Sequence, residues 1–403
     1  MSNLYAALEI GTTRTVLAVG ETDSSGRLRV TAHAEIPSSG IRKSQILDIG
    51  QATESIRSVL HAIEENHGGD IGEISVGNAL LAVSGQHIVA MPYSAAVSLS
   101  GDSVSQDDIN SVINAAHSMP LPKERELLDI VDQDYSLDNR GGGVRNPRGM
   151  NGRVLSLNTL QIHGDRNRIQ DARNAADAAH LEISESVYAV SCAAEAVLEE
   201  YEKKNGALVI DCGGGCTGYA AYIDGSIVAT NVLGVGGDHI TNDIAHAFQT
   251  TTPQAEGLKI YEASAMPVAC EGEAARVKVE RGENVLMDNR TVSRSALNTV
   301  VNTRVEELLT IIRDQLEEMD ILHRLRSGVI LTGGGSRLRN LEPLVEKIFG
   351  LAARIGRPVN VDGLDDAEYP PAFATIAGTL LYASRNYEEK SLIGDLLGRF
   401  FGK

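Results

Sequence analysis

The sequence predicts an α/β protein made of two similar lobes, because one arrangement of strands and turns occurs in both halves of the chain. Two stretches, 8–19 and 208–222, each contain an apolar run, an acidic residue, a glycine turn and a second apolar run. In each half a further strand-like run follows after another turn, at 27–36 and at 226–233. Apolar runs bounded by glycine turns are typical of strands. The duplicated order predicts two related sheets with a cleft between them.

The second turn has the composition of an anion-binding loop. Asp211 ends the first apolar run, and Gly213, Gly214, Gly215 and Cys216 follow it. Consecutive glycines let the backbone bring its N–H groups within reach of a phosphate, with no side chain in the way. A carboxylate at the strand end can hold Mg²⁺ through bound water, because Mg²⁺ keeps much of its hydration shell. An isolated glycine run is more often a plain hairpin turn, so the assignment depends on a second copy.

That second copy lies near the N-terminus. In an alignment on the acidic residue, Glu9 corresponds to Asp211, and both turns continue with any residue, a glycine and small residues. The residues of the first turn are Gly11, Thr12, Thr13 and Arg14. Two lobes that each offer a phosphate-binding turn predict a nucleotide between them. Glu9 and Asp211 are then the candidate ligands of its Mg²⁺.

A third strand, at 328–332, leads into a turn made of Gly333, Gly334, Gly335 and Ser336. The three turns, in this order, resemble the two phosphate motifs and the adenosine motif of the actin, sugar-kinase and Hsp70 ATPase superfamily. The resemblance extends to two smaller groups, which are Gly236, Gly237 and Asp238 on the phosphate side, and Glu256 and Lys259 beside the adenosine. It implies an actin-like two-lobed ATPase fold of duplicated ribonuclease-H-like domains, with ATP and Mg²⁺ as cofactors.

Composition and charge limit the other possibilities. A chain of 403 residues is long enough for two or three domains with a large core. The net charge of −18 argues against binding to nucleic acid. Four cysteines without a paired extracellular pattern suit a reducing cytosol. We expect no signal peptide, because strand-like sequence starts at once, and no apolar run long enough to span a membrane.

The first lobe is expected to carry an inserted subdomain. Strand-like runs at 79–100, 126–135 and 153–163 surround a helix that residues 105–108 start as a capping box. The loop at 146–152, just before the last run, has the sequence Asn-Pro-Arg-Gly-Met-Asn-Gly. A surface turn rich in glycine and proline would look the same. Its position, however, resembles subdomain 1C of the bacterial cell-division protein family FtsA, where actin and Hsp70 have a different subdomain.

The resemblance to the FtsA family implies a division of the whole chain. The expected parts are, in order, subdomain 1A (1–83), subdomain 1C (84–163), the second part of 1A (164–204), subdomain 2A (205–239), subdomain 2B (240–294), the second part of 2A (295–364), the closing helix of 1A (365–384), a hinge (385–391) and an amphipathic helix (392–403). The main helices are expected at 44–61, 167–179, 191–204, 295–319 and 373–379. Small residues in the last of these should let it pack closely against the first lobe.

The expected helix at 191–204 carries a candidate for catalysis. By its position before the second phosphate strand, Glu195 resembles the residue that polarises the attacking water in actin and Hsp70. A solvated glutamate on a helix surface would explain the residue equally well. Glu195 and Asp211 together form the expected catalytic set.

Three residues depart from the superfamily pattern. Glu9 replaces the usual aspartate, Cys216 replaces the threonine after the glycines, and Gly218 replaces an aspartate near the metal. We therefore expect ATP binding with slow or vestigial hydrolysis. A metal or redox site at Cys212 and Cys216 is not expected, because two thiols do not complete a tetrahedral site.

The last residues of the chain differ in kind from the rest. Apolar side chains spaced i, i+1, i+4 and i+5 fill one half of a helical wheel, and they are Leu392, Ile393, Leu396, Leu397, Phe400 and Phe401. A terminal helix docked on the body is the ordinary interpretation. The charged hinge before it, and Arg399 and Lys403 beside the two phenylalanines, favour an interfacial membrane anchor. FtsA proteins end in such a membrane-targeting helix.

By resemblance, the chain is expected to be an actin-like cell-division protein. Members of that family bind ATP, assemble into filaments and hold the FtsZ ring on the inner face of the cytoplasmic membrane. The FtsZ tail docks on their subdomain 2B, here about 240–292, and later division proteins are recruited through subdomain 1C. Two alternatives stay open, a small-molecule kinase of the same superfamily and a pilus-assembly adaptor resembling PilM. Neither has a use for a terminal amphipathic helix.

Overall fold

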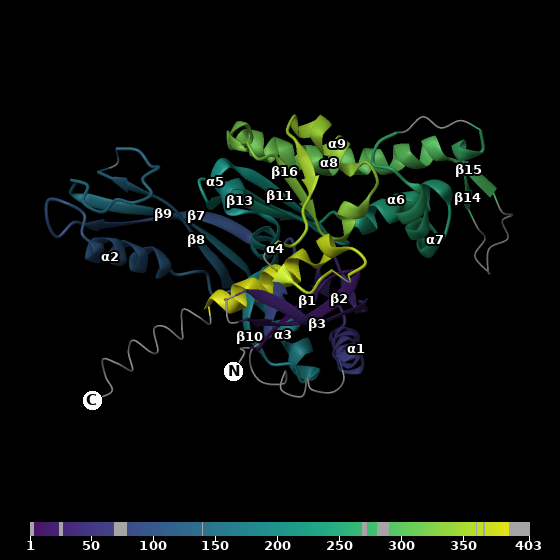
Figure 1. The fold of residues 1–403 in the computed structure, drawn as a ribbon, viewed down its shortest axis with the longest axis horizontal. Helices are drawn as coiled ribbons and strands as arrows, with labels where there is room; N and C mark the ends of the chain where they lie inside the picture. Colours follow the sequence, from purple (N-terminus) through teal and green to yellow (C-terminus); the bar gives the residue numbers. More distant parts are fainter. Residues whose placement is uncertain are drawn as a thin grey trace.

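The first lobe is a six-stranded sheet with helices on both faces (Figure 1). In the computed structural model, which describes residues 4–23, 27–67, 79–138, 140–267, 272–279, 290–359, 361–365 and 367–386, the strand order is β10-β6-β1-β2-β3-β18. The strands are β1 (Leu4–Ile10), β2 (Arg14–Thr22), β3 (Leu28–Pro37), β6 (Ala79–Val83), β10 (Ile183–Tyr188) and β18 (Val361–Asp362). The helices α1 (Ile49–His67) and α3 (Arg166–Ala178) cover one face, and a helix at 374–386 covers the other.

The second lobe repeats this plan with five strands in the order β13-β12-β11-β16-β17. They are β11 (Ala207–Cys212), β12 (Thr217–Ile223), β13 (Ser226–Leu233), β16 (Val329–Thr332) and β17 (Ala353–Ile355). The helices α8 (Arg294–Glu318) and α9 (Leu341–Phe349) lie on the outer face of this sheet (Figure 1). The expected apolar face of α8 is buried at Leu297, Val301, Val305, Leu308, Ile312 and Leu316.

The two sheets are arranged alike around a central strand. β1 pairs antiparallel with β2 and parallel with β6, and β11 pairs in the same way with β12 and β16. Glu9 lies opposite Val16 in the first sheet, and Asp211 lies opposite Gly218 in the second. The duplication expected from the sequence is therefore present in the fold.

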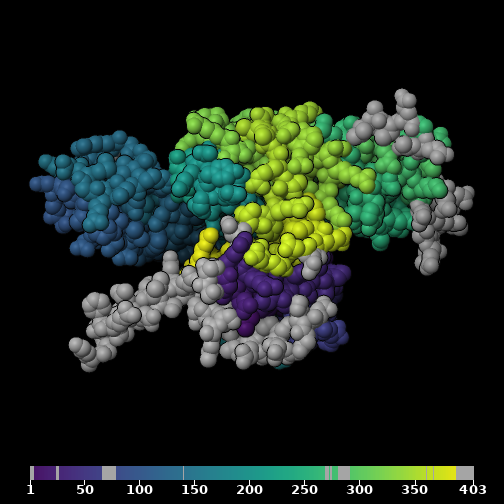
Figure 2. All heavy atoms as spheres, in the orientation of Figure 1, coloured from purple at the N-terminus to yellow at the C-terminus, as the bar shows by residue number. Residues whose placement is uncertain are grey.

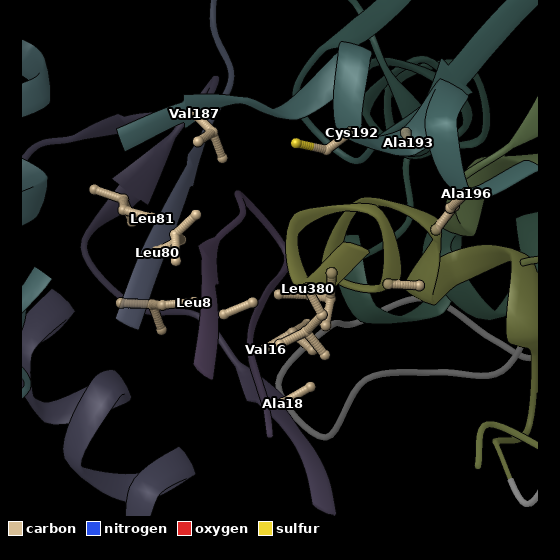
Figure 3. Close-up of a cluster of buried hydrophobic side chains, with 14 of the residues drawn as sticks. Leu8, Val16, Ala18, Leu80, Leu81, Val187, Cys192, Ala193, Ala196 and Leu380 are labelled. Carbon is tan, nitrogen blue, oxygen red and sulfur yellow. The ribbon is translucent and has the colours of Figure 1, made fainter. Parts of the chain in front are cut away.

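Two helices fill the space between the sheets. α4 (Ala189–Val197) packs against strands of both lobes, and the helix at 374–386 crosses it. Figure 3 shows Cys192 of α4, Leu380 of the closing helix and Val16 of β2 in one buried apolar cluster. The crossing requires a glycine, since a Cβ at Gly378 would overlap the carbonyl oxygen of Cys192. The close packing expected of the closing helix is confirmed.

A smaller subdomain extends the second lobe beyond the N-terminal half of α8 (Figure 1). It contains α6 (Gly237–Phe248), α7 (Thr252–Gly257), a π-helical turn (Leu258–Glu262) and a hairpin of β14 (Arg276–Val279) and β15 (Arg290–Ser293). Apolar side chains of α6, α7 and this hairpin join the same buried cluster as α8. The subdomain therefore shares the core of the second lobe.

The insert in the first lobe protrudes at the side of the molecule (Figure 2). Its sheet has the order β7-β9-β8, made of β7 (Val89–Ser98), β8 (Arg125–Leu137) and β9 (Val154–Asp165). The expected capping box is confirmed, because Ser105 and Asp108 exchange side-chain and backbone hydrogen bonds at the start of α2 (Gln106–His117). In the loop at 146–152, the N–H of Gly149 donates to the carbonyl oxygen of Val104 at 2.9 Å, which closes the loop onto the segment before α2.

The first expected helix begins later than the sequence pattern predicted. Lys43 and Ser44 form the tip of a hairpin between β4 (Ile41–Arg42) and β5 (Gln45–Ile46), both with positive φ. The helix starts at Ile49, where the carboxylate of Asp48 accepts from the N–H of Gln51 at 3.0 Å. The expectation of a helix from residue 44 is wrong because the apolar spacing does not reveal the left-handed tip.

The expected helix at 191–204 is two helices. α4 ends at Val197, and α5 (Glu200–Asn205) starts after Glu199. The break is stabilised by Glu202, whose carboxylate accepts from the N–H of Glu199 at 2.9 Å and pairs with Arg354 of the second lobe at 2.8 Å. A local capping contact and a long-range ion pair therefore override the helical pattern.

The C-terminal part differs from the expected boundaries in two places. β18 pairs in parallel with β3, so the chain has returned to the first sheet at Val361, before the expected boundary between Leu364 and Asp365. The closing helix runs to Asn386, so the first two residues of the expected hinge at 385–391 are helical. The expected amphipathic helix at 392–403 lies outside the described residues. Among the helices that the structure describes, none is long and apolar enough to cross a bilayer.

Candidate functional site

Both glycine turns are built in the same way. In the first, the N–H of Gly11 donates to the carbonyl oxygen of Arg14 at 3.0 Å. In the second, the N–H of Gly213 donates to the carbonyl oxygen of Cys216, also at 3.0 Å. A Cβ on either glycine would lie 2.7 Å from the same carbonyl oxygen, which leaves no room for a larger residue. The two lobes therefore contribute geometrically equivalent turns.

The two turns meet face to face. A Cβ at Gly214 would overlap Oγ1 of Thr13, and a Cβ at Gly215 would overlap Oγ1 of Thr12. The threonines of the first turn thus occupy the space that side chains of the second turn would need. An anion at this place can receive hydroxyl donors from one lobe and backbone N–H donors from the other.

Two partly buried carboxyl groups, those of Glu9 and Asp211, lie behind the turns. Burial raises the pKa of Glu9 from 4.5 to about 7 and that of Asp211 from 3.8 to about 6, although the charge of Arg14 opposes both shifts. Oε2 of Glu9 is buried and has no hydrogen-bond partner among the residues that the structure describes. A divalent cation such as Mg²⁺ would supply that partner and favour both charged forms. Among the described residues no group of three or more His, Cys, Asp or Glu forms a metal cluster, so water would complete the shell.

A cavity of about 320 Å³ opens between the lobes at the turns. The predicted residues on its wall are Glu9, Gly11, Thr12, Thr13, Arg14, Asp211, Gly213, Gly214, Gly215, Cys216, Gly237, Asp238, Glu256, Lys259, Gly333, Gly334 and Gly335. Segments that lie far apart in the sequence are thus brought to one place. The volume is in the range of small-molecule sites.

Another part of the wall carries an ion pair and an aromatic ring. Nζ of Lys259 lies 2.7 Å from Oε2 of Glu256 and donates to the carbonyl oxygen of Gly237 at 3.2 Å. The guanidinium carbon of Arg337 lies 5.7 Å from the ring centroid of Tyr369. A planar cation and a ring beside the third glycine turn suit a flat heteroaromatic base.

Two predicted residues support the wall from behind. Gly236 lies against the second turn, where a Cβ would come 2.6 Å from the carbonyl oxygen of Gly213. Ser336 is buried, and its hydroxyl donates to the carbonyl oxygen of Gly333 at 2.6 Å. Neither residue lines the cavity, so both act by shaping a glycine turn.

Glu195, the residue expected to polarise water, does not line the cavity, so the structure does not bring it together with the other predicted site residues. Its carboxylate pairs with Lys203 at 2.9 Å and with Arg385 of the closing helix at 2.7 Å. Burial by itself would raise the pKa of Glu195, but the two cations outweigh it and hold the pKa below its usual value. These ion pairs of Glu195 fasten α4 to α5 and to the closing helix.

Arg14 lines the cavity but is tied to its own lobe. Its guanidinium hydrogen-bonds Glu35 and the carbonyl oxygen of Ala372, and lies 5.1 Å from the ring centroid of Phe373. These contacts join the first turn to the start of the closing helix. Arg14 therefore acts on the site mainly through its charge on the carboxyl groups of Glu9 and Asp211.

Steric crowding explains why residue 218 is a glycine in this fold. It lies opposite Asp211 on β12, and a Cβ there would overlap Cγ2 of Val190 on α4. An aspartate at this position has no space unless Val190 moves. Burial raises the pKa of the Cys216 thiol, so the residue after the glycines does not supply an anion.

Sequence reasoning missed several wall residues, among them Ser44, Arg337 and Tyr369. Ser44 belongs to the hairpin tip, where the sequence pattern predicts a helix instead. Arg337 directly follows the third glycine turn, and this adjacency was the available signal. Tyr369 precedes two prolines, which indicate a turn but not the part of the fold that the turn contacts.

Comparisons with known proteins agree with this architecture. The family profile of cell division protein FtsA matches residues 208–378, and the profile of the SHS2 domain inserted in FtsA matches residues 85–163. Among solved structures, a chain of the PilM-PilN type IV pilus biogenesis complex has a TM-score of 0.64 at 18% identity, covering 94% of this chain and 98% of that one. MreB 5 of Spiroplasma citri bound to AMPPNP has a TM-score of 0.54 at 16% identity, covering 97% and 99%.

The sequence relatives are closer than these structures. Cell division protein FtsA of Pseudomonas aeruginosa is 32% identical over 380 residues, which cover 94% of this chain and 89% of that protein. Cell division protein FtsA of Escherichia coli K12 is 27% identical over 392 residues, which cover 95% and 91%. The chain has an actin-like fold and belongs to the FtsA family of cell division proteins.

Proposed function

We propose that the cleft binds ATP with Mg²⁺, and that the protein assembles into a filament that holds the FtsZ ring on the inner face of the cytoplasmic membrane. The observation that carries the nucleotide part is the pairing of two equivalent glycine turns in front of two partly buried carboxyl groups with raised pKa values. MreB 5, which shares the fold, was solved with the triphosphate analogue AMPPNP. Family membership supports the cell-division part.

Each group in the cleft has a role in this proposal. The N–H groups of the second turn and the hydroxyl groups of Thr12 and Thr13 hold the phosphates. Mg²⁺ supplies positive charge against the phosphates. Glu9 and Asp211 would hold its hydration shell, and their places on paired strands would fix that shell relative to both turns. The residues beside the third turn orient the base and ribose.

Hydrolysis is proposed to be slow. Gly218 offers no carboxylate beside Asp211, and Val190 fills the space where one would lie. Glu195, the expected polarising residue, is held in ion pairs outside the cavity. ATP would then act chiefly as a ligand that joins the lobes.

The membrane part of the proposal depends on the sequence of residues 390–403. Three basic residues and one aspartate give this segment a net charge of +2, whereas the rest of the chain carries −20, so attraction to anionic lipid is weak. Six apolar side chains contribute at most about 1.5–3 kcal/mol each. Three glycines oppose helix formation by up to about 1 kcal/mol each. One tail is therefore a reversible anchor.

Assembly would change this balance. Neighbouring subunits make later tails intramolecular binders, which raises the apparent affinity by about 10²–10⁴. The partners are proposed by family membership alone, with the FtsZ tail on residues 240–292 and later division proteins on the insert at 84–163. The same membership favours this function over a small-molecule kinase and over a pilus-assembly adaptor.

Sedimentation with lipid vesicles in the presence of Mg·ATP tests the proposal. Full-length protein should pellet with vesicles, and protein without residues 390–403 should not. Phe400→Glu should release filaments from vesicles, while Phe400→Leu, which keeps the apolar face, should retain binding. Pelleting of the Phe400→Glu variant under conditions where protein alone stays in solution would contradict the anchor. Equally tight binding by non-assembling monomers would contradict the role of avidity.

A further inference from the structure

The insert of the first lobe also contacts the second lobe, because β7 and β8 lie against β13 (Figure 1). Nη1 of Arg145 donates to Oγ of Ser226 at 3.0 Å, and Nη2 donates to the carbonyl oxygen of Ile223 at 3.2 Å. Nε2 of Gln133 donates to the carbonyl oxygen of Ile227 at 3.0 Å. These three hydrogen bonds form a clasp between the insert and the hairpin of β12 and β13.

A β-bulge presents the insert side of the clasp. The register of β8 with β9 shifts at Gln133, which is therefore an extra residue on β8. A bulge of this kind re-aims the side chain of the extra residue. The carbonyl oxygen of Gln133 accepts from the guanidinium of Arg145. Tyr135 and Val144 exchange backbone hydrogen bonds, which hold the loop of Arg145 against β8. Both side chains of the clasp are thus positioned by the insert itself.

The other side of the clasp is fixed to the second lobe. Asp224 and Gly225, both with positive φ, connect β12 to β13 and have the Asp-Gly sequence typical of two-residue hairpin loops. The N–H of Gly225 donates to the carbonyl oxygen of Lys203 in α5 at 3.0 Å. The carboxylate of Asp224 lies 3.3 Å from the guanidinium of Arg324, which precedes β16. A displacement of the second lobe relative to the insert would therefore change the clasp.

The clasp and the second glycine turn lie at opposite ends of one strand. β12 starts at Thr217, directly after that turn, and ends at Ile223, whose carbonyl oxygen belongs to the clasp. The 7 residues of this strand place its ends about 20 Å apart. Between them the lobes meet again, where the hydroxyl oxygens of Tyr188 on β10 and Thr230 on β13 lie 2.8 Å apart. The lobes are thus in contact at the glycine turns, at this buried pair and at the clasp.

We infer that the clasp couples the insert to the nucleotide cleft by holding the second lobe in the arrangement in which the two glycine turns meet. The inference rests on the proposed nucleotide function of the cleft. Because β12 and β13 are neighbours in one sheet, a rotation of the second lobe about the buried pair displaces the second turn and the hairpin together. A nucleotide that holds the turns together therefore stabilises the clasp, and by linkage the clasp favours nucleotide binding to the same extent.

Titration calorimetry with Mg·ATP tests the coupling. The double variant Gln133→Ala/Arg145→Ala should bind ATP about fivefold more weakly, because hydrogen bonds that hold the lobes together are lost. Arg145→Lys keeps the charge but cannot reach both of its acceptors, so it should change the affinity in the same direction by less. The control is Arg140→Ala, which removes an arginine of the same loop whose partner Asp138 belongs to the insert. It should change the affinity less than about twofold.

Double electron–electron resonance measures the arrangement of the lobes directly. Ser58 of α1 and Lys347 of α9 are exposed and lie in different lobes, so p-acetylphenylalanine at both positions can carry spin labels that leave the native cysteines unmodified. Without nucleotide, the double variant should show a broader distribution of distances than wild type, whereas Arg140→Ala should match wild type. A general loss of stability would lower the unfolding temperature without widening the distribution in the folded protein.

The two measurements separate the possible failures. Wild-type protein that does not bind Mg·ATP would refute the proposed function, and the distances would still decide whether the insert holds the lobes. Wild-type protein that binds Mg·ATP, with equal affinity in the double variant, would refute only the inference. The same distance distribution in wild type and the double variant would also overturn it, because the clasp would then not determine the arrangement of the lobes.

Discussion

The two glycine turns share one backbone geometry but differ in what they present to the cleft. The first presents the side chains of Thr12 and Thr13, and the second presents bare backbone at Gly214 and Gly215. Each threonine occupies the place where a side chain of the opposite turn would lie. The two turns are therefore complementary in shape. The threonines of the first turn fit only because the facing residues of the second turn are glycines.

The acids behind the turns differ in a related way. Oε2 of Glu9 is buried and has no hydrogen-bond partner in the described part of the chain, whereas hydrogen bonding by Thr375 counteracts the rise in the pKa of Asp211. Burial raises the pKa of Glu9 to about 7 and that of Asp211 to about 6. The first turn therefore contains the group that gains most from a bound cation.

The largest expected effect is on the pH dependence of stability, which should differ between variants of the two acids. Because the pKa of Glu9 rises from 4.5 to about 7 on folding, the protein without metal should lose up to about 3 kcal/mol of stability as pH rises through this range. Glu9→Gln should abolish that loss, and Asp211→Asn should remove the part between about pH 4 and 6. Urea unfolding without Mg²⁺ over this range measures the effect. Identical pH dependence in wild type and Glu9→Gln would contradict the buried state of Glu9.

The next effect would break the complementarity of the turns. In Gly215→Ala the new Cβ would overlap Thr12 and lie 2.9 Å from Cα of Lys43. Overpacking of this kind costs about 1–3 kcal/mol, and because the turns must approach each other around ATP, we expect roughly 5–150-fold weaker ATP binding. Gly257→Ala is the matched control, because no atom lies within 4 Å of its Cβ position. Unchanged affinity in Gly215→Ala would show that the turns do not need their close approach.

A smaller effect concerns the residues opposite the acids. Gly218→Asp should destabilise the fold by about 1–3 kcal/mol without raising turnover, because the new side chain overlaps Val190. Adding Val190→Ala should restore most of the stability and permit a gain in turnover. Thermal unfolding and single-turnover assays on both variants measure these changes. If Gly218→Asp alone is as stable as wild type and hydrolyses ATP faster, then Val190 moves aside without being replaced, and the steric argument is wrong.

The smallest effect on the site is expected outside both turns. Glu195→Ala should leave ATP affinity and turnover within about twofold of wild type, because Glu195 lies outside the cavity. It should lower the unfolding temperature, since the ion pairs with the buried Lys203 and the exposed Arg385 are lost. Glu200→Ala, which removes an exposed partner of the same lysine, is the control. A large loss of turnover in a stably folded Glu195→Ala variant would restore its catalytic role.

Much of the fold could be predicted because its signals are local. The two turns, the strands around them and the capping box of α2 depend on residues close together in the sequence. The registers of β1 with β2 and of β11 with β12 follow from these tight turns. The arrangement of two lobes followed from the order of the motifs.

The remaining features depend on contacts between distant residues. Nothing near Thr12 indicates that its hydroxyl lies against Gly215, and nothing near Glu195 indicates its pairing with Arg385. The left-handed tip at Lys43 and Ser44 is held by both lobes, so local propensity favours another structure there. Such features become visible only when the lobes are assembled.

Titration calorimetry of Mg·ATP into wild type and Asp211→Ala tests the central claim most directly. Asp211 lies behind the second turn and lines the cavity. It is one of the two acids proposed to hold the hydration shell of Mg²⁺. Wild type should bind one Mg·ATP per chain with an affinity that depends on Mg²⁺. Asp211→Ala should bind at least about tenfold more weakly and lose most of that dependence, because the metal shell loses a carboxylate. Equal affinity and equal dependence on Mg²⁺ in the two proteins would contradict the assignment of this cleft.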